Sequence, residues 1–272
     1  MRPESINKAM GFHNALGNFG SAIGVVSLSV FLATVGWRWT YFFWAFPILL
    51  WGVVLIRSKD LRAEHSEKKE LKSRPGFREL SFVVSSGFLV FLIAIAVREI
   101  GATGSSTFMT TYFVKERSLA ESIASLIYGL GPFVGIVGSL FGGYFGEKAG
   151  VRRAFSWMLV GCTVSLLTMF YVSQLYSLVV VYVLYAFFGN AMWSPMNALV
   201  ANLVPAKNVG IGFSIYFFTD GITTSIAPTL VAGVIELSAV SIIFPFRALF
   251  MFLTLIVFHF VPQSKNDPAR LG

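Results

Sequence analysis

The chain has 272 residues, of which 56% are hydrophobic, 16% aromatic and only 12% charged. A soluble core of this size cannot bury so much apolar surface, so the composition excludes a soluble domain and indicates lipid as the solvent. The net charge of +8 comes from basic residues between apolar runs. That pattern suits anionic lipid head groups and excludes nucleic acid as a partner.

Eight apolar runs are long enough, at roughly 20 residues each, to cross a bilayer as helices. None shows the period-two alternation of a barrel strand. The predicted fold class is therefore an all-α integral membrane protein with eight transmembrane helices. In chain order the runs are 11–34, 39–57, 82–113, 120–146, 154–172, 176–203, 209–235 and 242–261.

The positions of Lys and Arg predict the orientation of these helices. Most of the 21 basic residues fall on one side if both termini lie in the cytoplasm. We therefore expect a multi-pass protein of the cell membrane with both termini cytoplasmic. The segment RSKDLRAEHSEKKELKSRPGF, residues 57–77, is highly charged and has no hydrophobic face, which predicts a cytoplasmic linker between two membrane units.

Two charged residues interrupt the third run, in the stretch AIAVREIGATG. Arg98 and Glu99 lie about 24 Å from the start of that run if it is helical. Ionisable groups at such depth are costly, which favours either a transport role or an ion pair with a neighbouring helix that fixes packing. Adjacent helical positions point about 100° apart, so we do not expect these two charges simply to neutralise each other.

Small and polar residues mark three later runs. Gly131, Gly135, Ser139 and Gly143 recur every four residues in the fourth run and predict close helix packing. Asn190, Trp193 and Asn197 are spaced to share one helical face, where they could contact a ligand. The alternative for this face is interhelical hydrogen bonding with a kink at Pro195. Asp220 is a further acid within a span, and we expect it to be a partner for Arg98 or a second proton site.

The turn GGYFGEKAGVRRAF, residues 142–155, concentrates charge between the fourth and fifth runs. Its glycines allow two helix ends to approach, and Glu147 can accept from helix N-terminal amides or pair with a basic side chain. The alternative is a topology signal alone, which requires neither the glycines nor the acid.

This turn resembles the cytoplasmic loop signature of the major facilitator superfamily, G-x-L-a-D-r-x-G-r-k. Glu147 stands where Asp is usual, and Val151 replaces the first basic residue after the glycine. The basic central loop, the turn GWRWTYFFWA (36–45) and the segment STFMTTYFVKERSLAES (106–122) are also similar to that family. The matching residues of the signature are Gly143, Phe145, Gly146, Glu147, Lys148, Gly150 and Arg152.

The resemblance implies a secondary active transporter of a small solute, acting by alternating access and coupled to protons or ions. It aligns the eight spans with helices five to twelve of twelve, so the first four helices are expected to be missing, as part of a longer chain. The implied domains are 1–57, the last two helices of the N-terminal bundle; 58–79, a cytoplasmic central loop; 80–264, a C-terminal six-helix bundle; and 265–272, a cytoplasmic tail.

The resemblance also implies roles for single residues. Arg98 would bind an anionic or polar substrate, and Glu99 would carry a coupling proton. His13 and Asn18 could face the same cavity. The further substrate or coupling candidates are Asp220, Asn190, Trp193 and Asn197. The cytoplasmic gating motif would consist of Gly143, Glu147, Lys148, Gly150 and Arg152.

Two other interpretations remain open. One is an inactive fragment or half-transporter that needs a partner chain. The other is a membrane-embedded enzyme, which the sequence disfavours because it contains neither H-E-x-x-H nor G-x-S-x-G. We therefore predict no catalytic residue, no metal and no cofactor.

Overall fold

The computed structural model describes residues 6–57, 82–84 and 86–262, and every regular element within them is a helix. The predicted all-α class is confirmed. The predicted central loop at 58–79 and the tail at 265–272 lie outside the described residues. The helices are α1 (Ile6–Thr34), α2 (Trp37–Arg57), α4 (Ser86–Thr107), α5 (Met109–Lys115), α6 (Glu121–Ala149), α7 (Val151–Tyr171), α8 (Leu175–Ala191), α9 (Trp193–Leu203), α10 (Val209–Glu236) and α11 (Ile243–His259).

These helices correspond to the eight predicted runs, because α4 continues into α5 and α8 continues into α9. Within the described ranges, six segments are long and apolar enough to cross a membrane. Their lengths of 20 to 31 residues match the hydrocarbon thickness of a bilayer. They are Gly87–Lys115, Glu121–Ala149, Val151–Tyr171, Leu175–Leu203, Ala206–Glu236 and Val240–His259.

The chain divides into two compact units, Met1–Ala22 with Phe82–Gly272, and Ile23–Ser81. In the smaller unit the end of α1 packs on α2. The rings of Phe31 and Phe43 lie 4.7 Å apart, and the indole N–H of Trp44 donates to the hydroxyl of Ser27 at 3.0 Å. These contacts join the two helices beyond their short turn.

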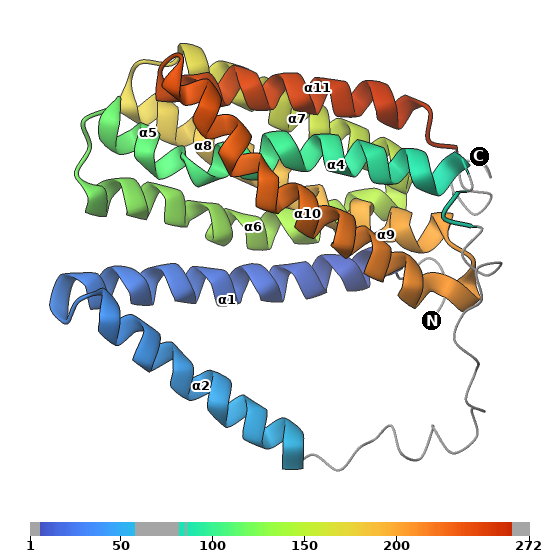
Figure 1. Ribbon diagram of the computed structural model, residues 1–272, viewed down its shortest axis with the longest axis horizontal. Helices are drawn as coiled ribbons and strands as arrows, with labels where there is room; N and C mark the ends of the chain where they lie inside the picture. The colour runs from blue at the N-terminus through green and yellow to red at the C-terminus, as the bar shows by residue number, and fades with distance from the viewer. Residues whose placement is uncertain (1–5, 58–81, 85, 263–272) are drawn as a thin grey trace. The chain divides into compact units, whose positions relative to one another are not determined.

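In the larger unit α4 packs against α10 on one side and α11 on the other, while α8 packs against α6 and α7 (Figure 1). The contact of α7 with α11 connects these two groups of helices. Figure 1 shows α10 crossing α4 obliquely. Residues of α4, α8 and α11 line one interior cavity, at which several polar side chains lie.

Two of the predicted spans are broken. The third span breaks at Phe108, where the hydroxyl groups of Ser106 and Thr107 both donate to the carbonyl of Thr103. Such local hydrogen bonds compete with the helical ladder. The sixth span breaks at Met192, because Pro195 has no N–H to donate to the carbonyl of Ala191. The kink predicted from Pro195 is thus present, three residues before the proline.

Glycine is required at two points on α6 and its end. Gly150 joins α6 to α7 with a φ of 85°, a left-handed conformation that favours glycine. Gly142 packs directly on the backbone carbonyl of Ala191, so closely that a Cβ atom would overlap the carbonyl oxygen. The broken end of α8 therefore lies against the backbone of α6.

We expect Gly142→Ala to destabilise the protein by about 1–3 kcal/mol, because the added methyl group must push α6 and α8 apart. Gly233→Ala is the matched control, since a Cβ atom there meets no atom within 4 Å. The thermal midpoint of the purified protein in detergent, followed by tryptophan fluorescence, measures the difference. Equal midpoints for the two variants would contradict the close packing of α6 on α8.

Candidate functional site

A cavity of about 310 Å³ lies within the larger unit. Its lining comes from α1, α4, α5, α6, α8, α9 and α11, and it combines charged groups with aromatic rings. The polar residues at its wall also include amides and hydroxyls from α1 and α8. The ionisable and aromatic residues that line it are Arg98, Glu99, Tyr128, Tyr182, Tyr185, Trp193 and Arg247.

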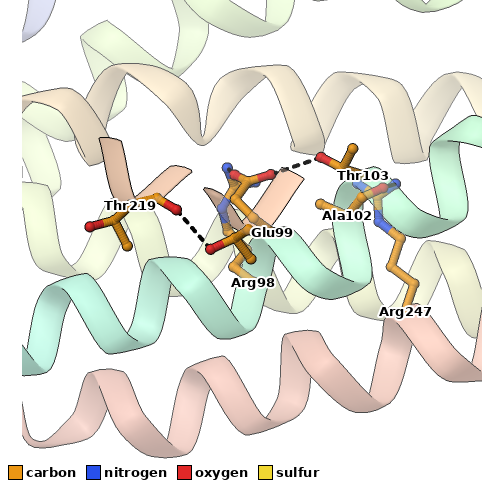
Figure 2. A network of polar contacts seen from close by, with 7 residues as sticks. Arg98, Glu99, Ala102, Thr103, Thr219 and Arg247 are labelled. Atoms are coloured by element: carbon orange, nitrogen blue, oxygen red, sulfur yellow. Dashed lines mark hydrogen bonds and ion pairs between the residues drawn. The ribbon is translucent and has the colours of Figure 1, made fainter. Parts of the chain in front are cut away.

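Arg98 and Glu99 form a buried ion pair with each other on α4. The second carboxylate oxygen of Glu99 accepts from the hydroxyl of Thr103 at 3.2 Å, one helical turn further on (Figure 2). The expectation that these neighbours do not neutralise each other is therefore wrong. The physical reason is the length of the arginine side chain, which spans the 100° between adjacent positions when both face the protein interior.

Trp193 provides the other neighbour of Arg98. The guanidinium carbon lies 5.1 Å from the centroid of the indole ring, a cation–π geometry. The Nε atom of Arg98 is buried without a hydrogen-bond partner. Arg98 thus lies at the cavity wall with its charge compensated by Glu99 and with one donor still free.

Arg247 on α11 is a cavity residue that the sequence analysis did not select. It is 5% exposed, donates to the backbone carbonyl of Ala102 at 3.0 Å, and lies 4.7 Å from the ring centroid of Tyr185. No carboxylate of the described residues lies within 4.0 Å of it. A lone arginine in the apolar stretch IFPFRALFMF is the same signal that selected Arg98, and it could have been found by the same rule.

Asp220 on α10 does not line the cavity. It lies within electrostatic range of Arg98 but forms no ion pair with it in the described part of the chain. Its Oδ1 atom is buried and has no hydrogen-bond partner, and the hydroxyl of Tyr216, one turn earlier, is in the same situation. The structure therefore gives Arg98 a partner on its own helix in place of the expected one on α10.

The predicted face of Asn190, Trp193 and Asn197 is divided by the break at Met192. Asn190 and Trp193 line the cavity, whereas Asn197 is buried outside it with an unpaired Oδ1 atom. The amide of Asn190 donates to the carbonyl of Ala186 at 2.8 Å.

Of the two α1 candidates, Asn18 lines the cavity and His13 does not. The amide of Asn18 donates to the hydroxyl of Ser139 at 2.9 Å, so one member of the small-residue stripe on α6 binds α1 through its side chain. A Cβ atom on Gly135 would lie 2.8 Å from the Asn18 amide carbon. The stripe therefore packs on α1 as well as on α8.

The charged turn between α6 and α7 brings its residues to one end of the unit. Glu147 forms a 2.7 Å ion pair with Lys8 of α1, and Lys148 lies 4.7 Å from the ring centroid of Tyr144. Gly143 is buried beside Gly11, whose Cβ atom, if present, would lie 3.2 Å from the Gly143 Cα atom. The acid of the turn thus pairs with a basic side chain rather than with the amides of the next helix.

Arg152 has a different role in this turn. Its guanidinium donates to the carbonyl of His259 at 2.7 Å and to that of Val261. Carbonyls at the end of a helix have no donor within the helix, so Arg152 satisfies the end of α11. Together with Gly150, it connects the start of α7 to α11.

Nothing among the described residues groups three or more His, Cys, Asp or Glu side chains as a metal site. Membrane-spanning helices around a cavity with buried charges define a multi-pass membrane protein with an internal polar site. The chain belongs to the major facilitator superfamily, because the model of that family matches residues 1–148 and 93–271. The resemblance drawn from the charged turn is confirmed.

Two curated proteins are similar to this chain. The alpha-ketoglutarate permease of Bacillus subtilis (strain 168) is 30% identical over 179 residues, which cover 63% of this chain and 40% of that protein. The sialic acid transporter NanX of Escherichia coli (strain K12) is 22% identical over 236 residues, which cover 84% of this chain and 57% of that protein.

Among solved structures, a bacterial homologue of the iron transporter ferroportin, in an outward-facing state, has a TM-score of 0.66 at 17% sequence identity. The match covers 95% of this chain and 64% of that one, and it shows the fold. This chain therefore spans between 40% and 64% of the length of these three proteins.

We expect Arg152→Gln to destabilise the end of α11 by about 1 kcal/mol, the net contribution of a hydrogen bond that loses its partner. Faster amide hydrogen exchange near residues 255–261, measured by mass spectrometry, would report this change. Arg153→Gln is the control, because Arg153 is exposed on the same helix. Equal exchange in both variants would remove Arg152 from its capping role.

We expect reversal of either charge of the Lys8–Glu147 pair to lower the thermal midpoint, and the double reversal Lys8→Glu with Glu147→Lys to recover it. Exposed ion pairs contribute about 0–1 kcal/mol, so the effect is small and a double-mutant cycle is needed to isolate it. Additive effects of the two single changes would show that the pair does not stabilise the fold.

Proposed function

We propose that this protein is a secondary active transporter that moves a small organic anion by alternating access. The observation that supports this proposal is the pair of arginines, 3% and 5% exposed, at the wall of one cavity among membrane helices. A cation at bilayer depth costs at least about 2.5–3.5 kcal/mol. An anionic solute offsets this cost while it is bound, which gives the cavity its selectivity for anions.

The names of the two curated relatives support the same substrate class. One name refers to alpha-ketoglutarate and the other to sialic acid, and both compounds are organic acids. Their bodies differ greatly in size and polarity, whereas the carboxylate is common to both. We therefore assign the carboxylate, and not the remainder of the molecule, as the recognised group.

Glu99 is the coupling group in this proposal. It lines the cavity, and its carboxylate holds the guanidinium of Arg98. Protonation of Glu99 would remove that negative charge and weaken its hold on Arg98, so a bound proton would change the net charge at the cavity wall. Asp220, outside the cavity but within electrostatic range of Arg98, is the second candidate for coupling.

We propose that the end of the unit bearing Lys8 and Glu147 is cytoplasmic, with both chain termini on that side of the cell membrane. The Lys8 side chain is 59% exposed, and exposed ion pairs contribute little net free energy. A weak pair of this kind suits a contact that must break in every transport cycle. Arg152, whose guanidinium donates to the carbonyls of Phe258, His259 and Val261, is instead proposed to be structural.

In the same proposal, α1 and α2 are the fifth and sixth helices of a twelve-helix arrangement, and residues 80–264 form the second six-helix bundle. The complete pathway then includes helices that precede α1 in the family arrangement. The larger unit nevertheless supplies both arginines, Glu99 and the aromatic wall of the cavity.

The test is uptake of labelled organic acids into proteoliposomes, compared with amide analogues that lack the charge. We expect Arg98→Ala to abolish uptake, because it removes the partner of Glu99 at the cavity wall. We expect Arg98→Lys to weaken uptake, because lysine keeps the charge but lacks the planar fork that holds the Glu99 carboxylate. Because Arg98→Ala leaves Glu99 buried without its partner, the double variant Arg98→Ala/Glu99→Ala separates loss of function from misfolding.

Arg153→Ala, which removes an exposed arginine on α7, is the matched control and is expected to transport normally. Normal uptake by Arg98→Ala would reduce Arg98 to a packing residue. Equal uptake of the acids and their amides would contradict an anionic substrate.

A further inference from the structure

We propose that Arg247, rather than Arg98, binds the carboxylate of the substrate, and that the Arg98–Glu99 pair limits the site to one net negative charge. The inference rests on the proposed function, because it concerns the same cavity. It names the substrate class more narrowly, as a monocarboxylate in preference to a dicarboxylate.

The two arginines differ in how far neighbouring protein groups compensate their positive charge. Arg98 has a carboxylate partner on its own helix and a second acid, Asp220, within electrostatic range on α10. Arg247 has a backbone carbonyl and an aromatic face as its neighbours. Of the two cations at the cavity wall, Arg247 is therefore the one whose charge the described protein groups leave uncompensated.

Arg247 also keeps donors for a ligand. One of its terminal nitrogens donates to the carbonyl of Ala102, and no other hydrogen bond joins its guanidinium to a described residue. An arginine has five N–H donors in a planar fork that matches a carboxylate. The ring of Tyr185 against the guanidinium holds this fork in place without using any of its donors.

Both carboxylate oxygens of Glu99 already have partners. One of its oxygens pairs with Arg98 and the other accepts from Thr103. The ionised groups at the cavity wall are then two guanidiniums and one carboxylate, which leaves one positive charge. Asp220 does not change this sum at the wall, because it lies outside the lining and on the Arg98 side.

A monocarboxylate bound to Arg247 neutralises the cavity. A dicarboxylate of the same length would bring its second carboxylate to an arginine that Glu99 already occupies, so two like charges would compete for one cation. Glu99 therefore excludes the second charge, and replacing it with a neutral residue of the same shape should admit that charge.

The experiment measures binding of two acids to the purified full chain by isothermal titration calorimetry. The probes are 2-oxopentanoate and 2-oxoglutarate, which share their first carboxylate and differ at the far end of the chain. We expect wild type to favour 2-oxopentanoate, and Arg247→Gln to lose about tenfold or more in affinity for both acids. Glu99→Gln should raise the ratio of 2-oxoglutarate to 2-oxopentanoate affinity by about tenfold.

Two further variants guard against misfolding and non-specific effects. Arg247→Lys keeps the charge and should retain the fold while it weakens the binding of both acids, because the planar fork is lost. Arg153→Gln should leave both affinities unchanged, since Arg153 is exposed on α7, away from the cavity.

Each outcome separates the inference from the proposed function. Wild-type affinities in both Arg247→Gln and Arg247→Lys would overturn the role of Arg247, while binding of acids by the wild type would leave the anionic function standing. An unchanged affinity ratio in Glu99→Gln would overturn the charge limit. If the wild type binds neither acid but binds the uncharged 2-oxopentanamide, the anionic function itself fails.

Discussion

A charged side chain placed among membrane helices needs hydrogen bonds or an opposite charge from the protein or from a ligand. Lipid hydrocarbon provides neither. In this molecule the requirement centres on α4, which carries both Arg98 and Glu99 and packs on α10 and α11. The ion pair compensates the two buried charges within a single helix. Since the pair takes no carboxylate from another helix, Arg247 of α11 lies beside the cavity with a backbone carbonyl of α4 and an aromatic ring as its neighbours.

The two helix breaks lie next to this cavity. Met109, directly after the break in the third span, and Trp193, directly after the break in the sixth, both line the cavity. Membrane helices tolerate broken backbone where it borders a polar interior. The breaks therefore belong to the construction of the site, since the first residue after each break lies at the cavity wall.

The sequence predicted the helices well because twenty-residue apolar runs have few alternatives in a membrane. It also identified Arg98 and Glu99 correctly as buried, since charge at that depth is conspicuous. The expectation that the two charges do not neutralise each other was wrong. The angle of about 100° between adjacent helical positions describes Cα–Cβ directions and not the reach of a long side chain. The sequence analysis missed Arg247, which lies only five residues into the predicted run 242–261. Depth in a folded bundle depends on how helices stagger, and spacing along one run does not contain that information.

α1 and α6 contact each other at three successive points within the larger unit. The two helices are antiparallel, and their contacts follow in order: Lys8 with Glu147, Gly11 with Gly143, and Asn18 with Ser139. On α6 these residues recur every four positions, so they form one stripe along the helix. At the centre of the stripe, Gly143 packs against Gly11 with no side chain between the two helices. The two polar contacts lie about 15 Å apart along α1. One of these contacts is a partly exposed ion pair, and the other is a hydrogen bond at the cavity wall. Under the proposed alternating access, a rocking motion of α1 would break the contact at the end of the unit and change the cavity lining at Asn18 together.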